Sequence, residues 1–497
     1  MNHIRTILAI GCLCSGVTAA TAGGILTNTN QSIDFLRNPA RDGAIGLDGV
    51  YSNPAGVAFM PEGFHLGAHW QYARQTRTVT STNPVFALGR KNRGETTKTF
   101  EGTADAPCIP SIQAAYNTGD WSIQFNFSVP GGGGACEFAD GLGSFESVVG
   151  NIATQLAPFG AKGYDMDGYM EGRQYYFGFQ LGTAYKIYDK LSVYGGLRLL
   201  YGTATYKAKI SNIMVNTGEG TYTNFGSFLQ YAATTVAASL ELVNAGMARY
   251  EAAGATAMPD YATLAQQKAQ LEGAQASFSS LQKYSQGVNL LCNQSSVGVA
   301  PVIGVDYKLN DHFNFAAKYE FKTQIRMKNE STVNEASEIA AVNKFRDGEK
   351  VNEDAPALLA VGAQYAPISD VRLNVGGHYY FDRQADWYAG AQDKLDHNSW
   401  EALAGAEWDV TDRLTISAGG QLTRYGLTDD YMNDMSFVVN SYSVGFGFNY
   451  KASDKVALKA GYFQTIYDTY DRQTSATVSD SFTRTNRVLG VGAEITL

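Results

Sequence analysis

Charged residues are scarce in this chain of 497 residues: Asp, Glu, Lys and Arg together make up 17% of it. The net charge of −9 supplies no basic surface for nucleic acid, so we expect no nucleic-acid partner. No Gly-x-Ser-x-Gly elbow, phosphate-binding loop or metal-ligand spacing occurs. Beyond residue 22, no apolar run reaches the length of about 18 residues that a membrane-spanning helix needs. These absences predict a protein that is not an enzyme, binds no metal or cofactor, and has no helical membrane span.

Glycine and aromatic residues are abundant instead, with 53 Gly, 30 Tyr and 25 Phe. This composition, combined with little charge, is unusual for a soluble enzyme. It is typical of transmembrane β-barrels, whose aromatic girdles lie at the two lipid interfaces. A closed barrel, like a helix, satisfies every backbone polar group within lipid.

Residues 1–22 have the pattern of a secretory signal peptide. Arg5 precedes a short apolar run over residues 7–17, and Ala20-Thr21-Ala22 is a small-residue cleavage site. The apolar run is too short to span a bilayer. Lipoprotein cleavage at Cys12 is an alternative, although the residues before it match such a site poorly. Three cysteines follow, and their odd number leaves at least one unpaired: Cys108, Cys136 and Cys292.

Apolar and polar residues alternate with a period of two in many segments, to the end of the chain. In residues 442–451 one face holds Tyr442, Val444, Phe446, Phe448 and Tyr450, and the other holds Ser443, Gly445, Gly447, Asn449 and Lys451. Successive side chains of a strand point to opposite faces, so in a membrane barrel the apolar face meets lipid and the polar face lines the lumen.

The connections between these segments are of two kinds. Six are short and polar, near residues 117–120, 189–190, 309–312, 368–370, 411–413 and 452–455. Seven long connections alternate with them, which predicts an all-β fold: an antiparallel transmembrane barrel of about 14 strands, with its turns on one side and its loops on the other. A soluble β-sandwich or propeller is the alternative, and the strict alternation of short and long connections argues against it.

Two regions lack the strand pattern. Residues 23–61 precede the barrel, which comprises residues 62–497, and could lie inside its lumen. In the long connection 211–295, apolar residues recur at helical spacing from Phe225 to Met247 and again from Leu264 to Leu281. We expect a helical pair on an extracellular loop, acting as a self-packing cap, as an apolar reception surface for a ligand, or as both.

Asn53-Pro54-Ala55, which follows Asp42-Gly43-Ala44, resembles the hatch motif of the FadL/TodX family of outer-membrane transporters for long-chain fatty acids and other hydrophobic compounds. The resemblance implies an N-terminal plug inside a fourteen-stranded barrel. It also implies a kink in the third strand that opens a lateral gate.

The third predicted strand is interrupted where that family would place its gate, at Pro130, Gly131, Gly132, Gly133 and Gly134. Proline cannot donate to a ladder and a glycine run packs no side chains, so strand pairing should fail there. Alternatively, the strand simply ends and a loop begins. Lys207 lies in a segment that resembles the family's basic segment, which implies contact with a ligand carboxylate.

Together these patterns predict transport of hydrophobic small molecules, above all long-chain fatty acids or similar lipids, by diffusion through a plugged barrel whose hatch shifts to permit lateral exit. The expected location is the outer membrane of a Gram-negative bacterium. The expected partners are the hydrophobic ligand (a fatty acid or hydrocarbon), outer-membrane lipid and lipopolysaccharide, and the barrel assembly machinery. A general porin or a surface adhesin is the alternative, because the predicted lumen also carries charge, at Arg198, Lys318, Glu320, Lys322 and Arg372.

Overall fold

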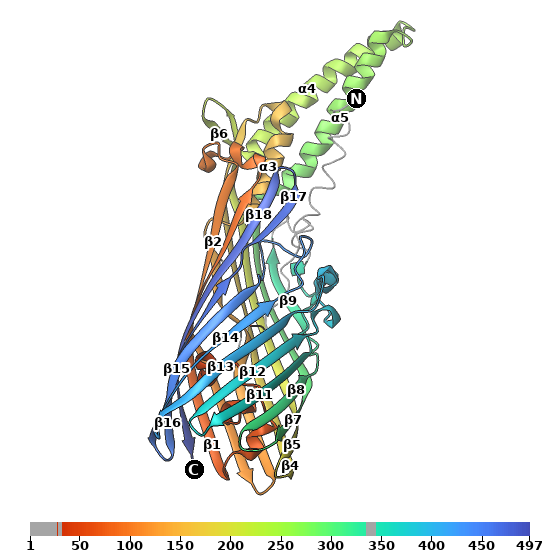
Figure 1. The fold of residues 1–497 in the computed structure, drawn as a ribbon. Helices are drawn as coiled ribbons and strands as arrows, with labels where there is room; N and C mark the ends of the chain where they lie inside the picture. The colour runs from red at the N-terminus through yellow and green to blue at the C-terminus, as the bar shows by residue number, and fades with distance from the viewer. Residues whose placement is uncertain (1–26, 28–31, 334–343) are drawn as a thin grey trace.

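The computed structural model describes residue 27, residues 32–333 and residues 344–497, so the predicted signal peptide (1–22) lies outside the described residues. Within them, fourteen antiparallel strands close into one barrel (Figure 1). They are β1 (Gly63–Thr82), β2 (Thr97–Thr118), β3 (Trp121–Phe138), β4 (Gly163–Tyr188), β5 (Leu191–Gly218), β7 (Val288–Lys308), β8 (Phe313–Glu320), β11 (Leu358–Ile368), β12 (Val371–Tyr380), β13 (Trp400–Thr411), β14 (Leu414–Arg424), β15 (Ser441–Ser453), β16 (Val456–Tyr467) and β18 (Val478–Thr496). Each pairs with the next, and β18 pairs with β1.

All six short connections expected from the sequence are turns between neighbouring strands, and they lie at the end of the barrel that holds the C-terminus (Figure 1). At the opposite end several strands, from β1 to β7 and β18, continue well beyond a membrane. β5 has 28 residues, whereas about 10 residues of a tilted strand cross a bilayer. Four shorter strands extend the sheet toward this end: β6 (Thr221–Asn224), β9 (Arg326–Val333), β10 (Lys350–Asn352) and β17 (Tyr470–Ser475).

Side chains of the barrel are sorted in the opposite sense to those of a soluble protein. Large apolar residues lie on the outer surface, where Ile123 is 51% and Leu181 is 62% exposed. Polar residues such as Gln113 and Asn126 are buried toward the lumen. Because the exposed belt is apolar, the outer surface of the barrel fits lipid rather than water.

The lumen is plugged by residues 32–61, which we call the hatch. It contains α2 (Ile33–Arg37) and two 3₁₀ helices, η3 (Leu47–Val50) and η4 (Gly56–Phe59). Helix α2 begins where the Ser32 hydroxyl accepts a hydrogen bond from the Phe35 amide (3.0 Å). It ends at Asn38, which is extended because a proline follows it.

The connection between β5 and β7 carries a helical hairpin, α4 (Phe225–Ala252) and α5 (Pro259–Gln282), which projects away from the barrel (Figure 1). This confirms the helical pair expected from the apolar periodicity. Apolar residues at its base, such as Phe228 and Leu281, are buried, whereas Leu242 further along is 77% exposed. In the part of the chain that the structure describes, no helix is both long and apolar enough to cross a membrane.

Smaller helices occupy other connections. These are η5 (Pro84–Leu88), η6 (Arg90–Asn92), α3 (Gly143–Gln155), η7 (Ala157–Phe159), η8 (Lys283–Gln286), η11 (Asp382–Gln384) and η12 (Tyr388–Lys394). Of these, α3 packs against β1, β4 and β5 and against η5.

Candidate functional site: the hatch, the lumen and the barrel wall

The hatch motif is fixed to three different strands. The Asn53 amide donates to Asp306 of β7 (2.6 Å). The carbonyl of Pro54 accepts from Gln124 of β3 (2.7 Å), and that of Ala55 accepts from the hydroxyl of Ser192 on β5 (2.6 Å). These groups are buried, and a buried polar group that loses its partner costs about 1–3 kcal/mol. Asn53-Pro54-Ala55 therefore lies at an anchored end of the hatch.

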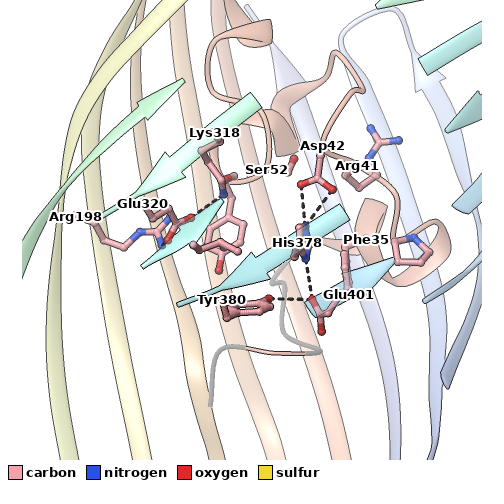
Figure 2. Close-up of a pocket in the computed structure, with 13 residues that line it drawn as sticks. Phe35, Arg41, Asp42, Ser52, Arg198, Lys318, Glu320, His378, Tyr380 and Glu401 are labelled. Carbon is pink, nitrogen blue, oxygen red and sulfur yellow. Dashed lines mark hydrogen bonds and ion pairs between the residues drawn. The ribbon is translucent and has the colours of Figure 1, made fainter. Parts of the chain in front are cut away.

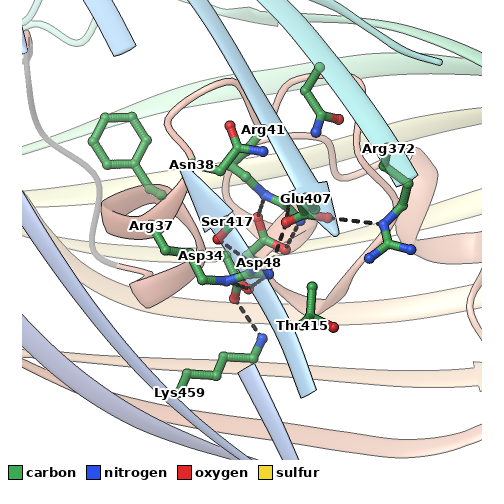
Figure 3. A network of polar contacts seen from close by, with 12 residues as sticks. Asp34, Arg37, Asn38, Arg41, Asp48, Arg372, Glu407, Thr415, Ser417 and Lys459 are labelled. Carbon is green, nitrogen blue, oxygen red and sulfur yellow. Dashed lines mark hydrogen bonds and ion pairs between the residues drawn. The ribbon is translucent and has the colours of Figure 1, made fainter. Parts of the chain in front are cut away.

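Buried ion pairs hold the other part of the hatch (Figure 3). The carboxylate of Glu407, on β13, lies 3.0 Å from Arg37 and 2.9 Å from Arg41. Arg372, on β12, contacts the same carboxylate at 3.2 Å. A buried carboxylate is stable as an ion only when it is paired, so this contact couples the position of the hatch to the wall.

Asp34 of α2 makes a second ionic clamp. Its carboxylate lies 2.6 Å from Lys459 of β16, and Lys459 in turn lies 2.5 Å from Glu494 of β18. Within α2, Asp34 also pairs with Arg37 at 2.7 Å. Helix α2 is thus tied through charged groups to β16 and β18, a different part of the wall from the hatch motif's own anchors on β3, β5 and β7.

A small cavity lies beside the hatch, and most of the residues around it are polar or charged (Figure 2). His378 lies 3.0 Å from Asp42 of the hatch and 2.7 Å from Glu401 of β13. On another side of the cavity, Glu320 pairs with both Arg198 and Lys318. The charged groups around this cavity therefore compensate one another within the chain.

The wall is irregular between β2 and β3. Their register is regular where residues 112–118 face 121–127, and it resumes where 103–105 face 135–137. The predicted gate residues Pro130 to Gly134 lie between these two regular parts. β3 does not end there: it continues to Phe138 and still pairs with β4, with two register shifts.

Backbone geometry explains why glycine is needed in this stretch. Gly132 has a φ of +84°, and a Cβ there would lie 2.0 Å from the carbonyl oxygen of Gln174 on β4. The amide of Gly134 donates to the hydroxyl of Tyr175 (3.1 Å). On the β2 side the chain contains Pro107 and Pro110, which have no amide hydrogen to donate. Both strands are therefore unsuited to a regular ladder here.

An apolar cluster extends from the hatch into this irregular stretch. Its members include Ile33, Phe35 and Leu36 of α2, Ala73 of β1, Ala106 and Ile109 of β2, and Val129 of β3. Val129 has the strand parity of the outward-facing Ile123 and Phe125, yet it is only 4% exposed. The apolar lining of the lumen thus continues into the thickness of the wall where the β2–β3 ladder is interrupted.

A second cavity lies near the extracellular end beneath α3. Apolar side chains make up nearly all of its lining, including Phe145, Val149 and Ile152 of α3, Ile210 and Ile213 of β5, Leu290 of β7, Phe345 and Met435. At its rim the Ser144 amide donates to the carboxylate of Asp434 (2.8 Å), and burial raises the pKa of that carboxyl. This apolar lining suits a hydrophobic small molecule.

Lys207 does not face the lumen. Its neighbours Tyr206 and Ala208 are buried on the lumenal side of β5, so alternation directs Lys207 outward. Its ammonium lies 2.9 Å from Glu171 on the adjacent strand β4, and its side chain is 45% exposed. This position gives no support to the contact with a ligand carboxylate that the resemblance implied.

The β2 side of the interrupted ladder was missed from the sequence. Ala106 and Ile109 lie opposite the glycine run and belong to the apolar cluster. Pro107 and Pro110 were the available signal, because two prolines within a predicted strand mark a place where the ladder cannot be complete. The three described cysteines are free, and Cys108 lies on the exposed face beside Ile109.

A fourteen-stranded barrel with a plugged lumen and an apolar outer surface has the architecture of an outer-membrane β-barrel. No protein-family model and no curated protein matches the sequence. Among solved structures, the fold is similar to that of a Pseudomonas aeruginosa FadL homologue (TM-score 0.62, 11% identity, 95% of this chain and 100% of that one). It is also similar to the Ralstonia pickettii toluene transporter TbuX (0.53, 12%, 94% and 98%) and the P. putida toluene transporter TodX (0.52, 13%, 91% and 94%). The chain therefore has the FadL/TodX-type fold.

Proposed function

We propose that this barrel carries hydrophobic small molecules across the outer membrane, with long-chain fatty acids or similar lipids as its substrates. The apolar cluster that joins α2 to the interrupted β2–β3 ladder is the observation that carries the proposal, because a water-filled pore would have no use for it. Two of the proteins that share the fold are toluene transporters, which supports a hydrophobic cargo.

Capture takes place in the apolar cavity beneath α3. Moving an apolar ligand from water into such a cavity is favourable by about 25 cal/mol for each Å² of apolar surface removed from water. The base of the α4–α5 hairpin packs in the same buried cluster as the cavity lining, so the hairpin supports this reception site.

Exit takes place sideways through the wall, at Pro130 to Gly134 and the facing stretch of β2. Here the ligand passes from Ile109 on the lumenal face to Val129 within the wall, and from there to lipid. It stays in apolar surroundings throughout, so it avoids the charged level of the lumen beside the hatch. No energy source is required, since net flow follows the concentration gradient.

The hatch keeps the barrel closed to water and ions while the ligand leaves. Asn53-Pro54-Ala55 acts as its anchor.

We expect lipopolysaccharide and lipid to surround the apolar belt of the barrel, and the barrel assembly machinery to insert the protein into the membrane. A general porin would conduct ions steadily, whereas we expect a planar bilayer with this protein to show little conductance.

A reversible block at Ile109 tests the exit route. The variant Ile109→Cys is made in a background in which Cys108, Cys136 and Cys292 are replaced by Ala. Uptake of radiolabelled hexadecanoate is then measured in cells lacking their own transporter. A bulky aromatic methanethiosulfonate should reduce uptake severalfold, and a reducing agent should restore it. Tyr116→Cys, which faces lipid on the same strand, is the matched control. Uptake that is unchanged when mass spectrometry shows full labelling at position 109 would contradict lateral exit.

A further inference from the structure

Arg77 and Arg484 face each other inside the barrel. They are register partners on the paired strands β1 and β18. Both lie on the lumenal face, because Val79 and Phe482, two residues away on each strand, are fully buried there. Like charges directly opposite each other in a sheet are destabilising, so we expect another interaction to compensate for the repulsion between the two guanidinium groups.

Neither guanidinium has an acidic partner among the residues that the structure describes. Arg484 donates to the carbonyl of Phe437 (3.4 Å) and to the side-chain oxygen of Gln75 (3.2 Å), both neutral. Its Nε is buried, and in the described part of the chain no hydrogen-bond acceptor reaches it. Arg77 lies over the ring of Phe437, 5.9 Å from its centre.

Other lumenal arginines behave differently. Arg37, Arg41 and Arg372 each contact a carboxylate within 3.2 Å. The lumen therefore pairs its arginines with acids at the level of the hatch but leaves two adjacent guanidinium groups without one at this higher level. An anion supplied from outside the chain would complete the arrangement.

Apolar side chains lie on both sides of the arginine pair along the strands. Phe437 and Phe482 belong to one buried cluster, and Ala73 and Val488 belong to the cluster that leads to the wall interruption. Arg77 is four residues from Ala73 on the same strand, which is about 13 Å at the usual rise. An extended alkyl chain starting at the arginine pair would reach the apolar exit route.

We propose that Arg77 and Arg484 form a head-group site for a monoanionic amphiphile, with its carboxylate on the two guanidinium groups and its alkyl tail directed toward Ala73 and Ile109. The inference rests on the proposed function and names the chemical class of its substrate. Guanidinium groups bind carboxylates through paired, charge-assisted hydrogen bonds. The site therefore selects a fatty acid over an uncharged hydrocarbon of similar size.

Equilibrium binding to the full-length barrel in a non-ionic detergent tests the site, with radiolabelled hexadecanoate and hexadecan-1-ol as probes. The double variant Arg77→Gln/Arg484→Gln should bind hexadecanoate about 10- to 100-fold more weakly, as expected for losing charged hydrogen bonds. Its affinity for the alcohol should not change. Arg77→Lys/Arg484→Lys should recover part of the hexadecanoate affinity. Arg487→Gln, at an exposed position of the same strand, is the matched control, and heat-modifiable mobility on gels confirms that each barrel is folded.

Two results would overturn the head-group site. If the double variant binds hexadecanoate as tightly as the native protein, or loses affinity for acid and alcohol equally, the arginines do not bind a carboxylate. Hydrophobic transport would still stand in that case, because both probes bind the native barrel. If the native barrel binds neither probe and conducts ions, the site and the proposed function fail together.

Discussion

Substitution of Glu407 by Gln should loosen the hatch without breaking the barrel. The carboxylate of Glu407 contacts Arg37 at 3.0 Å and Arg41 at 2.9 Å. Removing one partner of a buried ion pair costs about 3–5 kcal/mol. Arg37 keeps Asp34 and Arg41 keeps Asp48 as partners, so the lower end of that range applies. With tenfold for every 1.4 kcal/mol, about 3 kcal/mol shifts the equilibrium for hatch release about 100-fold.

Hydrogen exchange of the hatch amides measures this shift directly, and single-channel recording measures its effect on ions. We expect faster exchange over residues 33–50 and more frequent conducting events in Glu407→Gln. Asp409→Asn is the control, because Asp409 lies on the same strand and contacts Arg372 (2.7 Å) and Thr415 of the wall. If exchange in the hatch is the same in both variants, the ion pairs at Glu407 do not hold the hatch and the reasoning is wrong.

Three further outcomes follow from the structure. Phe345→Ala empties part of the extracellular apolar cavity, so it should cost about 3 kcal/mol locally and slow hexadecanoate uptake severalfold in initial-rate assays. Gly132→Ala should lower the thermal unfolding midpoint of the barrel by several degrees, because a Cβ there meets a backbone carbonyl at 2.0 Å; Gly195→Ala, whose Cβ would meet nothing within 4 Å, should leave the midpoint unchanged. Replacing residues 240–268 by a short Gly/Ser linker should change the free energy of unfolding in urea by no more than about 0.5 kcal/mol. The buried residues of the hairpin lie outside this segment, and changes at exposed positions rarely alter stability further.

The barrel could be predicted from the sequence because lipid and lumen impose opposite demands on alternate residues. In segments such as 442–451 the alternation of apolar and polar residues indicates both environments, and the short polar turns indicate where the chain reverses direction. The parts of the strands beyond the membrane, at the loop end of the barrel, lack this alternation, since neither of their faces contacts lipid. β5 therefore continues to Gly218 and β7 begins at Val288, whereas the apolar pattern suggested a connection over 211–295.

The candidate site could be predicted only where its residues are neighbours in the chain. Asn53-Pro54-Ala55 and the glycine run are visible as motifs, but nothing in the sequence assigns Asp306 as the partner of Asn53. The same holds for Arg77 and Arg484, which come from opposite ends of the chain and meet because β18 pairs with β1. The outward direction of Lys207 could not be predicted from its motif either, since a one-residue change in strand parity decides whether a side chain faces the lumen or the outside.

The two sets of anchors on the hatch suggest that it need not move as a body. Its motif is bound to β3, β5 and β7, and α2 is clamped by ion pairs, while the apolar route passes α2 on the side of Phe35 and Leu36. A disulfide in Pro54→Cys/Gly304→Cys tests this, because a Cβ at Gly304 would lie 3.6 Å from Cγ of Pro54, which brings the two positions close enough to be joined. In a background without the native cysteines, we expect hexadecanoate uptake to be the same in the oxidised and reduced protein. Uptake that stops on oxidation and returns on reduction would show instead that the hatch as a whole must shift for the ligand to pass.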